Sequence, residues 1–248
     1  MNDEAANRLA FPVANNFVVN GKNNNIKVDQ KDSEVAQSNL TTVIKGSVVG
    51  SSNTVKLSQA ANAKTLTNTI RGNSNTVTVT QESAIVSAED LIFNGDRNNA
   101  DVFVGGDNNA ATITQGGHMN KSTIAIGDEK NLGNQFNTAT IIQSGDHGTA
   151  NINITGNNNE ATIADIGQGN NLTINQAGKL NIASIKASGT YNTVTLTQNG
   201  DKNNAPLTIS GSGNNITYTQ TGNVVDTAAA LTFTGDKQTV NITRNKAQ

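Results

Sequence analysis

Residues 178–211 read GKLNIASIKASGTYNTVTLTQNGDKNNAPLTISG, and a glycine returns every eleven residues in this stretch. The same spacing extends in both directions without a slip over residues 137–222. Repetition at a fixed period is the signature of an architecture built by stacking similar units. The repeating glycines are Gly145, Gly156, Gly167, Gly178, Gly189, Gly200, Gly211 and Gly222.

Each eleven-residue unit divides into a strand and an arc. Seven residues alternate with period two and are rich in Thr, Ile and Val, which indicates a β-strand. The other four carry Gly, Asn, Asp or Ser, which are turn residues. Glutamine returns only every twenty-two residues, at Gln176, Gln198 and Gln220. One full coil is therefore two strands and two arcs.

The whole chain is predicted to be all-β, a two-sheet β-solenoid with about 22 residues per coil and roughly ten coils. Residues 1–16 are predicted to be a lead segment, and residues 17–248 a single solenoid domain. Insertions are expected at 31–38, 127–136 and 224–229. Upstream of the regular region, strands are expected near 24–30, 39–45, 53–59, 64–70, 75–81 and 86–92. Pro206 falls inside a strand, where a missing N–H predicts a local bulge.

Composition supports order by repetition rather than disorder. Hydrophobic residues make up only 34% and aromatic residues 3% of the chain, so a core made mainly of large apolar side chains would be thin. The net charge of −2 and the many β-branched residues are atypical of a disordered chain. An isoelectric point near 5.7 gives no electrostatic reason to expect nucleic acid as a partner. The chain has no cysteine, and no apolar run is long enough to insert into a membrane.

The periodic amide residues are expected to point inward. A buried amide is costly unless it is hydrogen-bonded, and stacked amides can satisfy one another from coil to coil. We therefore predict a structural ladder rather than a binding site, with no catalytic, metal or cofactor-binding residues. The predicted ladder members are Asn137, Gln143, Asn159, Asn170, Gln176, Asn181, Asn192, Gln198, Asn203, Asn214 and Gln220.

The arc glycines are predicted to adopt positive φ or to allow close backbone approach. They do not form a phosphate-binding phrase that opens a helix. No capping segment is recognised at either end of the repeat, and the last residues continue the repeat register. An uncapped, in-register β-stack favours end-to-end growth into a fibre.

The phrases QAGKLNIA (176–183) and QNGDKNNA (198–205) have the form Gln-x-Gly-x-x-Asn-x-Ala. This form resembles the repeat of curlins, the subunits of bacterial curli amyloid fibres. The resemblance implies a secreted, extracellular or cell-surface subunit of a biofilm fibre, with its signal peptide already removed. It further implies self-association, a nucleator subunit and a curli-type secretion pore as partners. Where curlin repeats tend to carry a second glutamine, this chain has Ile154, Asp165, Ala187 and Ile209.

Other chemistry is weaker in the sequence. His118 and His147 both fall in arcs, where a metal or pH site is an alternative to two solvated turn residues. The phrase GGDNNA faintly resembles a calcium-binding nonapeptide repeat, but the period is eleven rather than nine. No spacing indicates a catalytic set, so we predict that the protein is not an enzyme.

The main alternative function is a β-solenoid of the ice-binding or adhesin type that presents a flat Thr/Asn face. Ranks of outward Thr resemble the arrays of ice-binding β-solenoids, although Thr is also a good strand former. The residues predicted to share that face are Thr76, Thr78, Thr80, Thr149, Asn151, Asn153, Thr193, Thr195, Thr197, Thr217 and Thr219.

Overall fold

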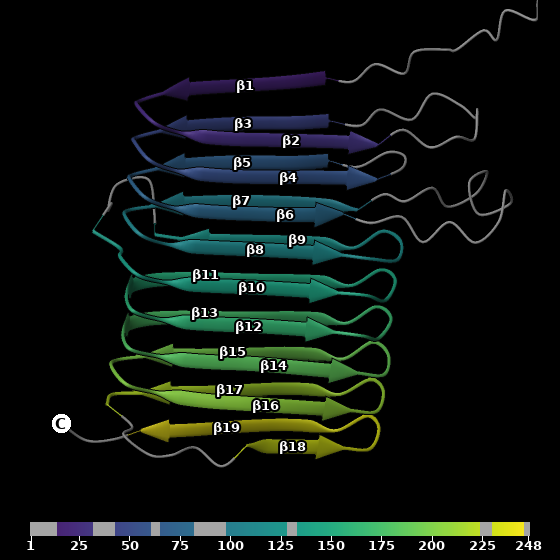
Figure 1. Cartoon of the computed structure of the whole chain (residues 1–248). Helices are drawn as coiled ribbons and strands as arrows, with labels where there is room; N and C mark the ends of the chain where they lie inside the picture. Colours follow the sequence, from purple (N-terminus) through teal and green to yellow (C-terminus); the bar gives the residue numbers. More distant parts are fainter. Residues whose placement is uncertain are drawn as a thin grey trace, which may run out of the picture.

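The computed structural model describes residues 14–31, 43–60, 65–81, 98–127, 133–223 and 230–245. These residues form nineteen strands and no helix, and the strands stack into two parallel sheets (Figure 1). Successive strands of the chain alternate between the sheets, so each coil contributes one strand to each. The predicted two-sheet β-solenoid is confirmed.

The strands of the ten-stranded sheet are, in spatial order, β1 (Ala14–Asn20), β3 (Val43–Val49), β5 (Thr65–Arg71), β7 (Asn99–Gly105), β9 (Lys121–Ile126), β11 (Thr149–Asn157), β13 (Asn171–Lys179), β15 (Thr193–Asn199), β17 (Asn215–Thr221) and β19 (Thr239–Asn245). The strands of the nine-stranded sheet are β2 (Asn25–Lys31), β4 (Thr54–Ala60), β6 (Thr76–Gln81), β8 (Ala110–Gln115), β10 (Thr138–Gln143), β12 (Glu160–Asp165), β14 (Ile182–Ser188), β16 (Asn204–Ser210) and β18 (Leu231–Thr234).

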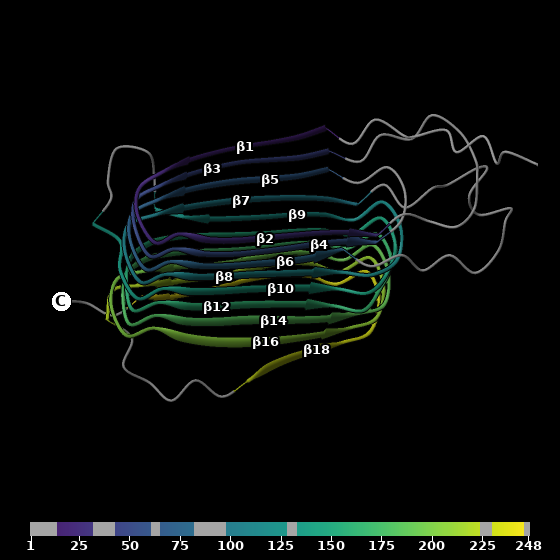
Figure 2. The same ribbon diagram turned by 45° about the horizontal axis from the view of Figure 1, so that its top comes forward.

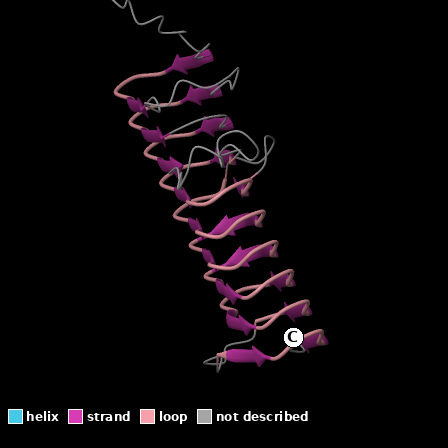
Figure 3. Cartoon of the chain, turned by 90° about the vertical axis from the view of Figure 1, so that its right-hand side faces the viewer, coloured by secondary structure: helices cyan, strands magenta, loops and turns pink. Residues whose placement is uncertain are grey.

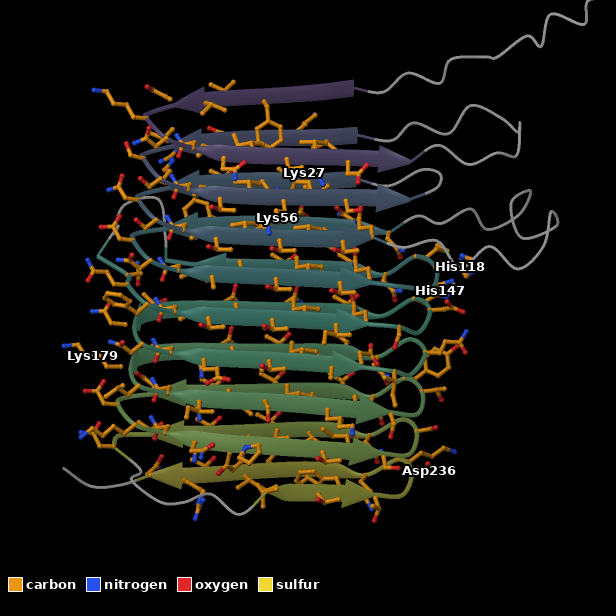
Figure 4. The ribbon with its side chains drawn as sticks, in the orientation of Figure 1. Lys27, Lys56, His118, His147, Lys179 and Asp236 are labelled. Carbon is orange, nitrogen blue, oxygen red and sulfur yellow. The ribbon has the colours of Figure 1, made fainter. Side chains whose placement is uncertain are left out.

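The two sheets run in opposite strand directions and are joined by arcs at both edges (Figure 2). Arcs that leave the ten-stranded sheet lie along one edge, marked by Lys179 in Figure 4, and are called here the Lys179 edge. The returning arcs lie along the opposite edge, marked by His118 and His147, and are called the His147 edge. Seen from the side, the coils repeat along a single axis (Figure 3).

Equivalent residues of successive coils lie directly over one another. Ile163 pairs with Ile185, and Ile185 pairs with Leu207, so the three side chains form one buried column. Inward and outward positions alternate along each strand, as the burial of β12 and β15 shows. Because each strand buries one face only, a thin core of aliphatic columns fills the space between the sheets.

Several details differ from the sequence-based expectations. The strand expected at 39–45 lies four residues later, as β3, and β3 has no asparagine immediately before it. The strand expected at 86–92 lies outside the described residues, and β5 and β7 are direct neighbours in their sheet. The bulge expected at Pro206 is wrong, because β14 and β16 pair continuously from Ile182 to Ser188. β1 begins at Ala14, within the segment 1–16 that was expected to lead into the solenoid.

Insertions between strands leave the stacking intact. The contact from one asparagine side chain to the next asparagine backbone spans 22 residues between Asn53 and Asn75, and 34 between Asn75 and Asn109. It spans 28 residues between Asn109 and Asn137. The pairing of strands in each sheet is therefore independent of the number of residues that separate them in the sequence. Of the expected insertions, 31–38 lies outside the described residues except for residue 31, 127–136 except for residues 127 and 133–136, and 224–229 entirely.

Candidate functional site

The predicted asparagines separate into two columns, one at each edge of the solenoid. At the Lys179 edge, the column contains Asn137, Asn159, Asn181 and Asn203, each immediately before or at the start of a strand of the nine-stranded sheet. At the His147 edge, it contains Asn170, Asn192 and Asn214. All seven are buried.

These asparagines bond mainly to backbone rather than only to one another. The Oδ1 atom of Asn159 accepts a hydrogen bond from the backbone N–H of Asn181 in the next coil, at 2.9 Å. The Nδ2 atom of Asn159 donates to the carbonyl oxygen of Gly178 in the next coil, at 2.9 Å. Each asparagine thus satisfies arc backbone groups that no strand partner could reach. The amide-to-amide ladder expected from the sequence is only part of the arrangement, as in Asn203 Nδ2 to Asn181 Oδ1 at 2.9 Å.

The same columns extend upstream through asparagines that were not among the predicted ladder members. These are Asn53, Asn75 and Asn109 at the Lys179 edge, and Asn98 and Asn120 at the His147 edge. The phrases GSSNTVKLSQ (50–59) and GNSNTVTVTQ (72–81) carry the signal for them, because each places an asparagine just before a strand.

The arc glycines permit the coils to approach closely. A Cβ atom on Gly178 would collide with the carbonyl oxygen of Gly200 in the next coil, and Gly178 also has a φ of 115°. At Gly145 the requirement for glycine comes from close packing alone. A Cβ atom there would collide with the carbonyl oxygen of Gly167, although the φ of Gly145 is not positive. The eight predicted glycines divide between the edges: Gly156, Gly178, Gly200 and Gly222 at the Lys179 edge, and Gly145, Gly167, Gly189 and Gly211 at the His147 edge.

The glutamines form two separate ladders on different sheets. In the ten-stranded sheet, Nε2 of Gln176 donates to Oε1 of Gln198 at 2.9 Å, and Nε2 of Gln198 donates to Oε1 of Gln220 at 2.8 Å. Each Nε2 also donates across the core to a strand carbonyl of the other sheet, such as Glu160 for Gln176 at 2.8 Å. The Gln176 ladder therefore ties coils together along the axis and ties the sheets together across it.

Gln143 belongs to the other ladder, in the nine-stranded sheet. Nε2 of Gln81 donates to Oε1 of Gln115 at 3.0 Å, and Gln143 Oε1 accepts from the Ser122 hydroxyl at 2.6 Å. Gln143 and Gln176 are thirty-three residues apart, an odd number of half-coils, so they lie on opposite sheets. Gln81, Gln115 and Ser122 were not predicted as members.

Asp165 stands where this second ladder would continue. Its Oδ1 accepts hydrogen bonds from Asn170 Nδ2 at 2.8 Å and from the Gly167 amide at 3.1 Å. Its Oδ2 lies where a side chain at Gly148 would project, beside Gln143. Burial raises the pKa of the Asp165 carboxyl above its ordinary value, although the hydrogen bonds from Asn170, Gly167 and Gln143 act in the opposite direction. Asp165 is thus a buried acid whose proton binding is coupled to folding.

Asn68 is a second polar departure in the core. It is 1% exposed, and neither its Oδ1 nor its Nδ2 has a hydrogen-bond partner. Its column neighbours are Gly46 on one side and Val102 on the other. The Phe17 ring occupies the space beside Gly46 that a side chain would need.

Both ends of the solenoid present open strand edges. Within the described residues, nothing pairs with the outer edges of β1, β2, β18 or β19. The inward apolar side chains of these end strands pack on the core but stay partly exposed. They are Phe17 and Ile26 at one end, and Leu231, Phe233, Val240 and Ile242 at the other.

The charged and titratable arc residues form no metal centre. His118 and His147 lie at the same edge (Figure 4), where the backbone N–H of His147 donates to the carbonyl oxygen of His118 at 2.8 Å. The backbone N–H of His118 donates to Asp146 Oδ1 at 2.9 Å. Among the described residues, no three His, Asp or Glu side chains are grouped as metal ligands. Nor does the described part of the chain contain a helix that could cross a membrane.

The predicted single threonine face is wrong. Thr76, Thr78 and Thr80 lie on β6 of the nine-stranded sheet, whereas Thr149 and the residues after it lie on the ten-stranded sheet. The outer face of the ten-stranded sheet from β11 to β19 nevertheless carries aligned Thr and Asn residues, as in the pairing of Thr195 with Thr217. On the nine-stranded sheet, Lys27 pairs with Lys56 (Figure 4).

A comparison with family models identifies one part of the chain. Residues 189–222 match the model described as the curlin associated repeat. This segment is similar to the curlin repeat. It contains β15, β16 and β17, with Gln198 and Gln220 from one ladder and Asn192, Asn203 and Asn214 from the edge columns.

The predicted resemblance to curlins is confirmed by this match. A search of curated proteins finds no match. The columns of the curlin repeat continue through β9 to β14, which pair in the same register outside the matched segment. The match and the all-β solenoid together indicate a structural repeat.

Proposed function

We propose that the protein is the structural subunit of an extracellular, curli-like amyloid fibre and that it polymerises along the solenoid axis. One observation carries the proposal: within the described residues, both sheets end in open edges whose inward apolar side chains are only partly covered. An open edge of a regular sheet is a template for another chain. A second copy could pair with these edges and cover the apolar side chains that they leave partly exposed.

The polar columns support this proposal because they are unfinished at the ends. Asn24 is the first described member of the Lys179-edge column, and its Oδ1 accepts a hydrogen bond from the Asn53 backbone N–H at 3.0 Å. At the other end, Gln238 is the last described member of the His147-edge column, and its backbone N–H donates to Asn214 Oδ1 at 2.9 Å. Added coils would extend such columns in the manner of cross-β assemblies.

The resemblance to curlins supplies the cellular part of the proposal. A secreted fibre subunit would use a nucleator subunit and a curli-type secretion pore as partners, and would act at the cell surface in the biofilm matrix. The polymer itself needs no cofactor, nucleic acid or membrane insertion.

Electron microscopy and fibre diffraction of the purified protein test the proposal. The expected result is unbranched filaments with a meridional reflection near 4.7 Å and an equatorial one near 10 Å. A chain that stays monomeric, with its far-ultraviolet β-signal intact, would overturn the proposal.

A pair of matched variants tests whether the open ends carry assembly. Phe233→Lys with Ile242→Lys places charges on the inward side of the last two strands, a device that blocks edge pairing. Thr232→Lys with Thr243→Lys places the same charges on the outer faces of the same strands. Only the inward pair should abolish filament growth. Equal growth of the two variants would show that assembly does not use this end.

A second candidate function rests on the two central outward columns of the ten-stranded sheet from β11 to β19, which carry no charged residue. Two central columns there run Asn151, Thr173, Thr195, Thr217, Asn241 and Asn153, Asn175, Thr197, Thr219, Thr243. This regular lattice of hydroxyl and amide groups is the chemistry of an ice-binding surface. Thermal hysteresis by the monomer would favour this function, and its absence would dismiss it.

A further inference from the structure

The unequal strand numbers of the two sheets restrict how two copies can stack. If one copy is translated along the axis onto another, the ten-stranded sheet becomes continuous only after a shift of ten strand spacings. The nine-stranded sheet becomes continuous only after a shift of nine. A shift of nine would place β1 of one copy in the position already occupied by β19 of the other, so the two strands would collide. Among the strands of residues 14–245 that the structure describes, head-to-tail stacking therefore leaves one position of the nine-stranded sheet unfilled at every joint.

A two-fold joint removes this conflict. A rotation by 180° about an axis parallel to the strands places the nine-stranded sheet of one copy over the ten-stranded sheet of the other. At the joint, β19 of each copy then meets β18 of the other, and the two contacts are equivalent by symmetry. Because the two sheets run in opposite strand directions, both new pairings are antiparallel. Both sheets continue without a gap.

The side chains at this end match across such a joint. Gln115 Nε2 donates to the Ser122 hydroxyl at 3.0 Å, so the third inward position of the nine-stranded sheet lies opposite the first inward position of the ten-stranded sheet. Phe233 occupies the former column and Val240 the latter. In the two-fold joint, Phe233 of one copy therefore lies over Val240 of the second, and Leu231 lies over Ile242.

Head-to-tail stacking gives poorer partners. Column register would place Ile242 on Phe17 but Arg244 on Val19, an inward-facing valine. Leu231 and Phe233 would face the empty strand position. Apolar surface that the two-fold joint covers would stay in contact with water.

We propose that copies of this chain meet through their β18–β19 ends in a two-fold, antiparallel joint, not head to tail. The inference rests on the proposed function, and it makes the fibre non-polar. A two-fold joint also leaves both sheets continuous at the opposite end, where β1 of each copy would pair with β2 of the other. That joint pairs Phe17 with Val28 and Val19 with Ile26, all apolar.

Disulfide trapping tests the joint, because the chain has no cysteine of its own. Thr232 and Asn241 are exposed and lie on the outer faces of opposite sheets, so they cannot bridge within one molecule. In the two-fold joint they are direct antiparallel neighbours, with Cα atoms about 4.5–5.5 Å apart, which a disulfide can span. In head-to-tail stacking, the neighbour of Asn241 is instead position 16, because both belong to one column.

Filaments are grown from equal mixtures of Thr232→Cys and Asn241→Cys, oxidised, and analysed on a non-reducing gel with peptide mapping. The expected result is a mixed dimer linked through positions 232 and 241, absent from either variant alone. Thr208→Cys, one strand further inside, is the matched control, and with Asn241→Cys it should give no dimer.

The alternative joint is tested in parallel with Asn16→Cys and Asn241→Cys. Filaments that trap only the 16–241 pair would overturn the two-fold joint while leaving the proposed function standing. Absence of any filament or end-to-end dimer would overturn both.

Discussion

Removal of one edge asparagine should lower the free energy of unfolding, because buried backbone groups of the next coil lose their hydrogen-bond partner. Asn181 Oδ1 accepts from the Asn203 backbone N–H at 3.0 Å, and its Nδ2 donates to the Gly200 carbonyl at 2.7 Å. In Asn181→Ala both of these arc groups lose that partner. A buried group left unsatisfied costs about 1–3 kcal/mol, so the variant should lose about 2–6 kcal/mol.

The matched control is Asn153→Ala. Asn153 Nδ2 donates to Asn175 Oδ1 at 2.9 Å in a similar column, but this contact is exposed on the outer face. Water replaces a lost partner there, so the control should cost under about 0.5 kcal/mol.

Local opening is the appropriate measurement, because a stacked array need not unfold in one step. Hydrogen exchange of the Asn203 amide and the arc 200–203 should accelerate strongly in Asn181→Ala, and urea denaturation should shift to lower concentration. If Asn181→Ala and Asn153→Ala have equal effects on both measurements, the backbone-satisfaction argument is refuted.

Three further substitutions probe other features. Asn68→Val should raise the free energy of unfolding by about 1–3 kcal/mol, since it removes two buried atoms without partners; a loss in urea denaturation would contradict this. For Asp165, the folded state binds the proton more tightly than the unfolded state. Stability should therefore fall as pH rises from the ordinary carboxyl value through the raised pKa, and Asp165→Asn should flatten that part of the pH profile; an unchanged profile would count against it. Leu180 has a φ of 58°, a conformation that asparagine tolerates better than leucine and that Asn158 adopts one coil earlier. Leu180→Asn should therefore raise the free energy of unfolding by about 1 kcal/mol. A lower midpoint of thermal denaturation in this variant would contradict the prediction.

The fold of residues 137–222 was predictable because a constant eleven-residue period determines in which of the two sheets each strand lies. Residues an even number of half-coils apart share a sheet, which is why the column of Ile163, Ile185 and Leu207 follows directly from spacing. The same arithmetic separates Gln143 from Gln176, but only when each residue is assigned to its sheet.

Upstream, the period alone could not assign strands. Asn75 and Asn109 are 34 residues apart, so counting by elevens assigns Thr76 and Thr149 to one face, whereas β6 and β11 lie in opposite sheets. The sequence LTTVIKG alternates equally well from residue 39 or residue 43, which explains the displaced β3. Asn68 was not singled out, and Asp165 was noted only as a departure from the curlin pattern, because the period does not indicate how a departing buried group is satisfied.

Because strand pairing between coils does not depend on loop length, the arcs are suitable sites for inserting a foreign sequence. The chain already places residues 82–97 between Gln81 and Asn98 while β6 and β8 remain bonded neighbours. A guest epitope or enzyme tag grafted there would leave the hydrogen-bonded scaffold unaltered. In a filament with two-fold joints, each copy adds nineteen strands over two sheets, so such grafts would recur about every 9.5 strand spacings, or about 45–47 Å on average. Display density along the polymer would thus be set by the scaffold and not by the guest.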